Sequence, residues 1–209
     1  MLIFINVLIA YLIGSIPTAY WIGKHLHGID IRELGSKNAG ATNSFRVLGK
    51  KSGWIVLSVD VLKGVAAATL PFWFQGQLLG FKDELLIMQL SASFSAVFGH
   101  VFPIFAGFRG GKGVATSLGI VIGLNPVAAA ICLGVFLLVF VSSKYVSLGA
   151  ITAALVFPFV SYFILNNDIR IMIIFTIVLS FLVIIVHRKN ISRIVKGEEN
   201  KMNPLRKKV

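Results

Sequence analysis

Long blocks of apolar residues, separated by short polar segments, form the main pattern along this chain of 209 residues. All blocks but one are close to the length of about 20 residues at which an α-helix crosses the hydrocarbon core of a bilayer. The first block begins at Leu2 and further blocks follow it, so we expect it to be a retained span and not a cleaved signal peptide. The pattern predicts six apolar stretches: Leu2–Gly23, Gly53–Phe74, Leu85–Phe105, Gly113–Val141, Val146–Leu165 and Ile169–Val186.

The fourth stretch is longer than one span requires, and the dipeptide Asn125-Pro126 interrupts it. Proline disfavours helical geometry in the residue before it and has no N–H for its own turn. We therefore expect either one kinked helix or two helices, Gly113–Leu124 and Pro126–Val141. A helix of about 12 residues rises only about 18 Å, short of the roughly 30 Å hydrocarbon core. Such a helix should tilt, start deep in the bilayer or lie against protein, with its N-terminus at a polar cavity.

The distribution of positive charge decides between six and seven spans. With seven spans and an outer N-terminus, every Lys and Arg except Lys63, Lys82 and Arg170 falls on the inner side. With six spans, Lys144 and the basic tail would lie on the side opposite the first polar loop. Because basic residues accumulate in cytoplasmic segments, the pattern predicts an all-α integral membrane protein with seven transmembrane helices, the N-terminus outside and the C-terminus cytoplasmic.

Composition supports this interpretation and narrows the function. Hydrophobic residues make up 56% of the chain and charged residues 13%, whereas a soluble domain carries about 25% charged residues. In a soluble protein the formal net charge of +12 would suggest nucleic acid, but here the basic residues lie beside apolar blocks. Membrane lipids explain that placement, and no nucleic acid is expected. Cys132 is the single cysteine, which excludes an intrachain disulfide, and the sequence indicates neither a metal site nor a cofactor.

Two polar segments combine glycines with basic residues. The first runs from Gly35 to Asn43 and is followed by Arg46. Its small residues allow backbone N–H groups to point into a concavity that suits phosphate oxygens, although an ordinary flexible loop has the same composition. The second consists of Gly99–Pro103 and Phe108–Thr116. It puts glycines and Lys112 at the N-terminus of an apolar helix, where the unpaired amides and the dipole favour an anion. A plain positive-inside anchor is the alternative for this second segment.

Three further groups lie at or within the predicted spans. Ser147 stands at a helix start, where it could reach a phosphate or simply cap the helix. His187 and Asn190 are three residues apart and share a helix face, although a histidine at such a position is also a common interfacial residue. Asp60 and Lys63 lie within the second span at i,i+3 spacing, so we expect a structural ion pair.

Taken together, the polar segments resemble the bacterial acyl-phosphate:glycerol-3-phosphate acyltransferase family. The first loop and GGKGVAT are the most specific of the matching segments. The chain departs from the family pattern at two positions: Glu198 stands where a threonine is expected, and Ala150 stands where a serine is frequent. The matching segments cover almost the whole chain in the family's order and are GSIPTAYWIGK, DIRELGSKNAGATNSFRVLGKKSGW, DVLKG, GHVFPIFAGFRGGKGVAT, KYVSLG and HRKNISRIVKGEEN.

The resemblance implies seven spans with an outer N-terminus, in agreement with the charge pattern. It also implies an enzyme of the bacterial cytoplasmic (inner) membrane, with its active site on the cytoplasmic face. The reaction would transfer a fatty acyl group from acyl-phosphate to the 1-hydroxyl of glycerol-3-phosphate, giving lysophosphatidic acid and phosphate in the first acylation step of phospholipid synthesis. By position, the family's essential active-site residues correspond to Ser36, Arg46, Lys112, His187 and Asn190.

The chemistry of these residues suggests how two phosphorylated substrates are bound. We expect the acceptor phosphate to be held by Arg46, Lys112, Gly110, Gly111 and Gly113, with Ser36, His187 and Asn190 nearby. We expect the acyl-phosphate headgroup to be held by Gly35, Asn38, Gly40, Thr42, Asn43 and Ser147. We assign structural roles to Asp60, Lys63 and Glu199.

The donor is a mixed anhydride with a good leaving group, so direct attack by the glycerol hydroxyl is expected without a covalent acyl-enzyme. Either His187 or a substrate phosphate could take the proton, and the phosphate is the favoured acceptor. Residues 1–209 are expected to form a single membrane-embedded domain, partly helical after His187, with a frayed basic tail at 203–209 and most simply a monomer.

Two other functions fit parts of the pattern. Short broken helices with a lysine at a helix N-terminus also occur in transporters and flippases. Alternating access, however, would need binding groups near the midplane, whereas the polar segments here all fall on one side. A membrane-anchored structural subunit would have no need for two glycine-rich anion segments. The pattern therefore favours the enzyme.

Overall fold

The computed structural model describes residues 1–77, 82–165 and 168–202. Within these ranges the chain is helical and has no β-strand, so the predicted all-α class is confirmed for the described part. The chain forms two compact units, Met1–Pro126 and Val127–Val209. The predicted frayed tail at 203–209 lies outside the described residues.

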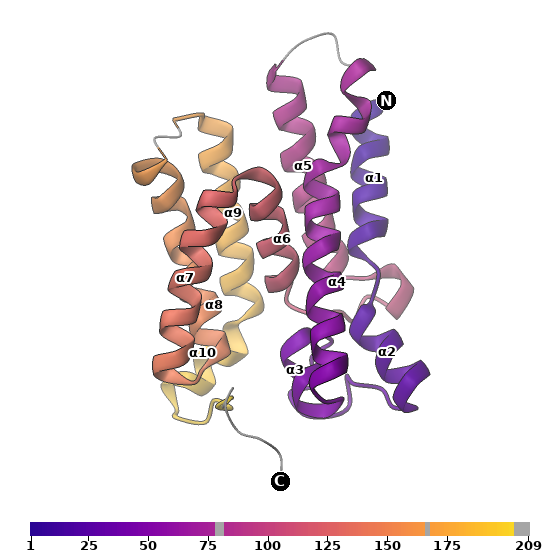
Figure 1. Cartoon of the computed structure of the whole chain (residues 1–209), viewed down its shortest axis with the longest axis vertical. Coiled ribbons are helices and arrows are strands. Elements are labelled where there is room, and N and C mark those ends of the chain that lie inside the picture. The colour runs from indigo at the N-terminus through magenta and orange to yellow at the C-terminus, as the bar shows by residue number, and fades with distance from the viewer. Residues whose placement is uncertain (78–81, 166–167, 203–209) are drawn as a thin grey trace. The chain divides into compact units, whose positions relative to one another are not determined.

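The first unit is built from three long helices and several short ones (Figure 1). Helix α1 packs on α5, and α4 packs on α5, α6 and the short α3. The first predicted span is broken at Ser15–Pro17, where Pro17 precedes the first residue of α2. The elements are α1 (Leu2–Gly14), α2 (Thr18–His27), α3 (Ala41–Val47), α4 (Lys50–Thr69), η1 (Leu70–Gln77), α5 (Lys82–Val101), η2 (Ile104–Ala106) and α6 (Val114–Leu124).

Glycines allow the helices of this unit to approach backbone to backbone. A Cβ added at Gly64 of α4 would overlap the carbonyl oxygen of Thr116, and one at Gly119 of α6 would overlap that of Val61. A Cβ at Gly14 of α1 would likewise overlap the backbone of α5. Small residues at helix interfaces are typical of membrane proteins, where close packing replaces the hydrophobic drive between helices. This packing holds α6, which has only 11 residues, against α4.

The second unit contains α7 (Pro126–Ser143) without its first residue, α8 (Val146–Phe159), a π-helical turn η3 (Val160–Ile164), α9 (Arg170–Val186) and α10 (Arg188–Val195). Helices α8 and α9 pack together, and Ser180 donates a hydrogen bond to the Ala154 carbonyl at 2.5 Å. Pro158 lies inside α8, directly before the π-helical turn, as expected for a residue that cannot donate to the helix ladder. The predicted helical segment after His187 is confirmed by α10.

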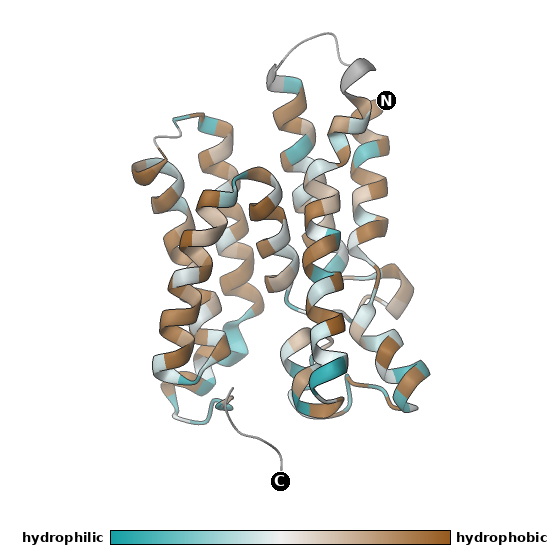
Figure 2. Cartoon of the chain, in the orientation of Figure 1, coloured by the Kyte–Doolittle hydropathy of each residue, from teal (hydrophilic) through white to brown (hydrophobic). Residues whose placement is uncertain are grey.

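Hydrophobic residues occupy much of the length of the long helices in each unit (Figure 2). In the described part, five helical stretches are long and apolar enough to cross a membrane, and there are six if α9 and α10, which are bent by 60°, count as one span. The five stretches are Leu2–His27, Lys50–Phe74, Glu84–Ala106, Pro126–Ser143 and Val146–Ile164. Helix α6 is apolar but shorter than these.

The interruption at Asn125-Pro126 separates two helices. Helix α6 ends at Leu124, Asn125 is extended with φ −156° and ψ 99°, and α7 begins at Pro126. The alternative of one kinked helix over Gly113–Val141 is therefore wrong, and the two-helix alternative is confirmed. The physical reason is the conformational bias that Pro126 imposes on the residue before it.

Candidate active site

Asn43 holds the first glycine-containing loop together. Its side chain is buried, and Oδ1 accepts a hydrogen bond from the Ser36 N–H at 2.9 Å. Its Nδ2 donates to the carbonyls of Ile31 and Leu34, both at 3.0 Å. A Cβ at Gly35 would overlap Asn43 Oδ1, so only glycine allows this close approach. The amide of Asn43 therefore fixes the loop that carries Ser36, and its predicted contact with the acyl-phosphate headgroup stays a prediction.

The other predicted residues of the first loop lie on the segment that Asn43 organises. Gly40 precedes the first residue of α3, Thr42 lies in its first turn and Arg46 in its last turn. Ser36, Asn38, Thr42 and Arg46 are each half-buried, so they keep surface that a ligand could contact. The structure thus brings Ser36 and Arg46 onto one loop–helix segment of the first unit.

The glycine segment Gly110–Gly113 runs back along the C-terminal end of α5. The Gly110 N–H donates to the Val101 carbonyl at 3.2 Å, and the Gly111 N–H donates to the His100 carbonyl at 3.1 Å. A side chain at either glycine would overlap His100. Both N–H groups donate to α5 in this structure, and the use of these two glycines for a substrate phosphate stays a prediction. The glycines serve close packing, which the sequence pattern did not distinguish from anion binding.

The start of α6 retains the features of an anion site. Gly113 precedes the helix with φ +75°, a left-handed conformation that glycine adopts without strain. The first amides of an α-helix, here from Val114 onward, have no acceptor within the helix. Lys112 stands directly before this turn and is half-buried. A lysine at the positive end of a helix dipole is a suitable arrangement for a phosphate.

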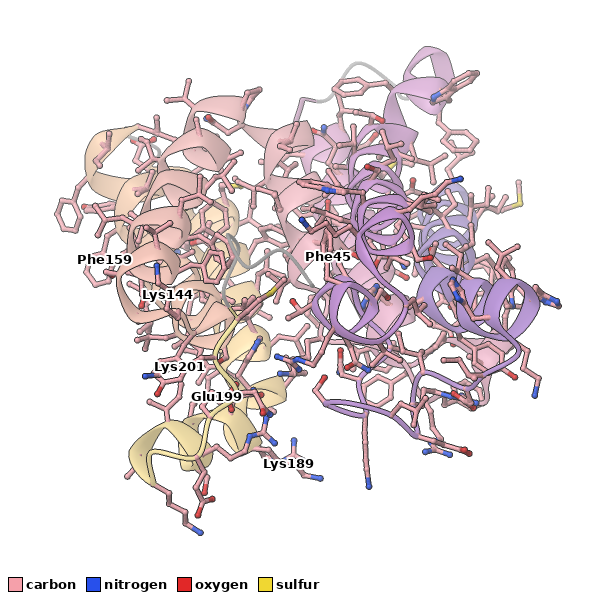
Figure 3. All side chains as sticks on the ribbon, turned by 60° about the horizontal axis from the view of Figure 1, so that its bottom comes forward. Phe45, Lys144, Phe159, Lys189, Glu199 and Lys201 are labelled. Atoms are coloured by element: carbon pink, nitrogen blue, oxygen red, sulfur yellow. The ribbon has the colours of Figure 1, made fainter. Side chains whose placement is uncertain are left out.

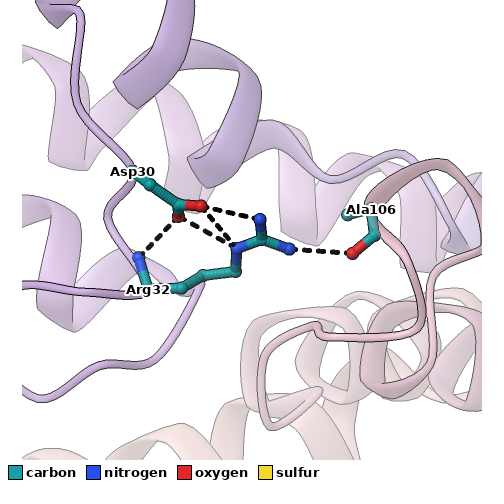
Figure 4. A network of polar contacts seen from close by, with 3 residues as sticks. All are labelled: Asp30, Arg32 and Ala106. Carbon is teal, nitrogen blue, oxygen red and sulfur yellow. Dashed lines mark hydrogen bonds and ion pairs between the residues drawn. The ribbon is translucent and has the colours of Figure 1, made fainter.

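Arg32 connects the two segments (Figure 4). Its Nε and Nη2 donate to the carboxylate of Asp30, the latter at 2.7 Å, and Nη1 donates to the Ala106 carbonyl at 2.8 Å. The guanidinium also lies 4.2 Å from the ring centre of Tyr20. The side-chain hydrogen bond from Arg32 is the main reason why the pKa of Asp30 lies below its ordinary value. The first loop is thereby fixed to the turn that leads into the glycine segment.

The ion pair expected between Asp60 and Lys63 is present, with 2.8 Å between Nζ and Oδ1. Both side chains are buried within α4 and its neighbours. His100 approaches the same carboxylate, with 3.7 Å between its Nδ1 and Asp60 Oδ1. Sequence reasoning placed His100 in the second polar segment and Arg32 on the inner side of the membrane, but it gave neither residue a role of its own. The available signals were a histidine in an apolar span and two opposite charges at Asp30 and Arg32.

In the second unit, His187 stands between α9 and α10 and is 2% exposed. Its Nδ1 lies 2.7 Å from the Val183 carbonyl. Because a carbonyl can only accept, Nδ1 carries the proton, and the neutral ring has its lone pair on Nε2. When His187 is neutral, it is therefore the tautomer with its lone pair on Nε2.

Glu199, labelled in Figure 3, lies in the segment after α10. It joins the remaining predicted residues of the second unit. Its Oε1 accepts hydrogen bonds from Asn190 Nδ2 at 2.6 Å and from Ser147 Oγ at 2.8 Å, and its Oε2 accepts from Arg193 Nε at 2.7 Å. Burial raises the pKa of Glu199, but these three hydrogen bonds outweigh burial and hold it below its ordinary value. The carboxylate thus fixes Asn190 and the start of α8 within this unit.

Ser147 does not cap α8. The residue preceding the helix is Tyr145, and no side chain makes a cap hydrogen bond there. The Ser147 hydroxyl hydrogen instead goes to Glu199, a contact across 52 positions of sequence that local reasoning could not indicate. The capping alternative for Ser147 is therefore wrong, and binding of the acyl-phosphate headgroup stays a prediction.

The predicted residues are distributed over both units. Ser36, Arg46 and Lys112 belong to the first, and His187 and Asn190 belong to the second. Within the described residues, no group of three or more His, Cys, Asp or Glu is arranged to hold a metal ion. What the described residues of the two units offer are amides, cationic side chains, the buried histidines His100 and His187, and the carboxylates of Asp60 and Glu199.

Comparison with known proteins identifies the family. Residues 4–197 match the sequence profile of the family described as glycerol-3-phosphate acyltransferase. The glycerol-3-phosphate acyltransferase of Listeria monocytogenes is 48% identical, with 93% of this chain and 94% of that protein covered. The protein of the same name from Chlorobaculum tepidum is 41% identical, with 94% and 95% covered.

Comparison with solved structures identifies the same family. The crystal structure of PlsY (YgiH), an integral membrane glycerol 3-phosphate acyltransferase, in its glycerol 3-phosphate form has 36% sequence identity and a TM-score of 0.85, and 98% of each chain is covered. Its lysophosphatidic acid form has 35% identity and a TM-score of 0.82, with 98% of this chain and 97% of that chain covered. On these grounds the chain belongs to the glycerol-3-phosphate acyltransferase family of integral membrane enzymes, which act in phospholipid synthesis.

Proposed function

We propose that this chain transfers a fatty acyl group from an acyl-phosphate to the 1-hydroxyl of glycerol-3-phosphate, giving lysophosphatidic acid and phosphate. The observation that carries the proposal is Lys112 at the N-terminus of α6, directly after Gly111, which lies against Ala39 of the loop that carries Ser36. The names of the solved relatives include glycerol 3-phosphate and lysophosphatidic acid, which are the acceptor and product of this reaction.

We propose seven membrane crossings, with the N-terminus outside and the reaction on the cytoplasmic face. Separate helices α6 and α7 supply the additional crossing that the charge distribution requires. Helix α6 rises only about 16 Å at 1.5 Å per residue, so it needs protein and not lipid around its N-terminus. Its glycine packing against α4 provides that cover. Both units would act as one acyltransferase domain in a monomer.

The acceptor phosphate is assigned to Lys112, Arg46 and the first amides of α6. A guanidinium can bind two phosphate oxygens at once, and a lysine supplies a point charge beside the helix terminus. Ser36, on the same segment as Arg46, is assigned to the same phosphate or to the glycerol hydroxyls. The acyl-phosphate headgroup is assigned to Gly35, Asn38, Gly40, Thr42, Asn43 and Ser147.

The reaction needs one displacement. A bond forms between the glycerol 1-oxygen and the acyl carbon, and the bond between that carbon and the phosphate oxygen breaks. The phosphate leaves with the electron pair, and the proton of the attacking hydroxyl passes to a phosphate oxygen, whose second pKa of about 6 suits this role. His187 and Asn190 are assigned to orienting the substrates, and the basic Nε2 of His187 makes it the alternative proton acceptor.

The decisive assay uses the purified full chain with radiolabelled glycerol-3-phosphate and an acyl-phosphate. Label that becomes lipid-soluble supports the acyltransferase, whereas water-soluble label trapped inside proteoliposomes indicates a transporter and overturns the proposal. Repeating the assay with acyl-CoA tests the donor. Lys112→Ala should raise the KM for glycerol-3-phosphate, and Lys51→Ala, which removes an exposed lysine at the start of α4, is the matched control.

A further inference from the structure

A cluster of buried polar side chains lies between α4, α5 and α6, and the proposed reaction leaves it unused. Lys63 Nζ is 2.8 Å from Asp60 Oδ1 and donates to the Ile16 carbonyl at 3.0 Å. His100 of α5 places Nδ1 3.7 Å from the same carboxylate oxygen and 3.1 Å from Oγ1 of Thr116 on α6. Asp60, Lys63, His100 and Thr116 are between 0% and 6% exposed.

Stability is a weak reason for this arrangement. Removing two charges from water costs several kcal/mol per ion, and well-packed apolar residues often stabilise a buried site at least as well. Ionisable residues inside membrane spans are therefore a functional hypothesis by default. Asp60 and Lys63 neutralise each other, so they add no net charge that would attract a phosphate. What the cluster does supply is a fixed position for the imidazole of His100.

His100 contacts the glycine segment through its backbone and through its ring. Its carbonyl accepts the Gly111 N–H at 3.1 Å. Its ring lies so close to Gly111 that a Cβ there would overlap Nε2. Gly111 is the residue before Lys112, so the position of the His100 ring determines where the chain can place Lys112.

A cavity of about 10 Å³ lies at this junction. The volume is close to what a single water molecule requires. Polar groups of the cluster line one part of it, and Ala39 of the first loop and Gly110–Gly111 line another. A Cβ at Gly111 would also be only 2.8 Å from the Ala39 carbonyl oxygen. The cluster, the first loop and the glycine segment therefore meet at His100 and Gly111.

We propose that His100 is a positioning residue for the acyl acceptor: the Asp60–Lys63 pair and Thr116 fix its ring, and the ring sets the position of Gly111 and thus of Lys112. This inference rests on the proposed role of Lys112 in binding the phosphate of glycerol-3-phosphate. The buried cluster thus supports binding of the acceptor glycerol-3-phosphate, and other residues bind the headgroup of the donor acyl-phosphate.

The test separates the two substrates kinetically. His100→Leu keeps an apolar side chain but removes both ring nitrogens, and it should raise the KM for glycerol-3-phosphate by about tenfold, equivalent to one weakened charged contact. The kcat and the KM for acyl-phosphate should each change by less than about twofold. The lost interaction is equally strong in the ground state and the transition state, and losing such an interaction changes only the KM of the substrate it binds. His100→Asn, which keeps a polar atom near the position of Nδ1, should recover part of the loss.

A double-mutant cycle tests the contact with Gly111. Gly111→Ala alone should raise the KM for glycerol-3-phosphate, because its Cβ would overlap His100 Nε2. In the His100→Asn background the overlap with Nε2 is relieved. The increase in KM of the double variant should therefore be smaller than the product of the two single increases. Independent, multiplying effects would overturn the proposal, and this cycle still decides if His100→Leu does not fold.

The buried pair provides the control for folding. Asp60→Leu alone should fold poorly because it leaves Lys63 unpaired, and adding Lys63→Met should restore the folded protein. If the double variant also recovers a wild-type KM for glycerol-3-phosphate, the cluster is only structural and the proposal fails. A KM that stays raised in the folded double variant supports it. A wild-type enzyme that forms no lipid product would instead refute the proposed function itself.

Discussion

Replacing Arg32 with methionine tests the connection between the first loop and the turn before the glycine segment. Methionine keeps the unbranched apolar stem and removes every guanidinium donor. The variant loses the hydrogen bonds to Asp30 and to the Ala106 carbonyl and the contact with the Tyr20 ring. The contact with Asp30 is local, whereas those with Ala106 and Tyr20 join Arg32 to other parts of the first unit, so the loop should loosen.

The expected loss of stability follows from the burial of the Arg32–Asp30 ion pair. The side chains of Arg32 and Asp30 are 13% and 17% exposed, between the limits of a surface pair and a fully buried one. A surface pair contributes about 0–1 kcal/mol, and breaking a buried pair costs about 3–5 kcal/mol. The hydrogen bond to Ala106 adds about 1.5 kcal/mol, and the cation–π contact about 0.5–1 kcal/mol. Because such contributions are not additive, we expect a total of about 3 kcal/mol for Arg32→Met.

Thermal unfolding in detergent, followed by tryptophan fluorescence, measures this loss. Trp21 lies 6.4 Å from Phe105, ring centre to ring centre, and so reports on the same region. A change of about 3 kcal/mol should lower Tm by about 6–12 °C in a chain of this size. Arg32→Lys should lose less stability than Arg32→Met. The lysine ammonium can keep the ion pair with Asp30, but it lacks the planar guanidinium that donates to Asp30 and Ala106 at the same time.

Arg188→Met is the matched control, since Arg188 is exposed on α10 and makes one long hydrogen bond of 3.4 Å to the Ile185 carbonyl. Its Tm should stay close to that of the wild type. The reasoning about Arg32 is refuted if Arg32→Met lowers Tm by no more than Arg188→Met. It is also refuted if Arg32→Met and Asp30→Asn have fully additive effects, because side chains in direct contact should couple.

Three further predictions concern packing, acid stability and catalysis. Gly119→Ala should destabilise the first unit by about 1–3 kcal/mol, because its Cβ overlaps the Val61 carbonyl of α4; Gly134→Ala, with nothing within 4 Å of the added Cβ, should be neutral or slightly stabilising in the same unfolding assay. The depressed pKa of Asp30 contributes stability that is present above the unfolded pKa of about 4 and is lost as pH falls through the lower folded pKa. Asp30→Asn should remove this part of the acid dependence in a series of Tm measurements, and an unchanged acid profile would contradict the assignment. His187→Ala should retain near-normal turnover at saturating glycerol-3-phosphate if a phosphate takes the proton; loss of one limb of the pH–rate profile would instead identify His187 as the base.

The sequence by itself determined the features that depend on neighbouring residues. Apolar blocks predicted helices because helix length and lipid thickness are fixed quantities. Pro126 predicted the boundary between α6 and α7 because its ring restricts the residue before it. The spacing of Asp60 and Lys63 predicted their ion pair because side chains three residues apart share a helix face.

Only the tertiary structure decided what each polar group in the candidate site contacts. The amides of Gly110 and Gly111 donate to α5, Ser147 donates to Glu199, and Arg32 reaches Ala106 across 74 positions of sequence. A glycine allows both a phosphate cradle and a close helix contact, and a serine hydroxyl suits a ligand and a carboxylate equally. These alternatives have the same local sequence, and they are separated by which distant backbone or side chain folding brings within hydrogen-bond distance.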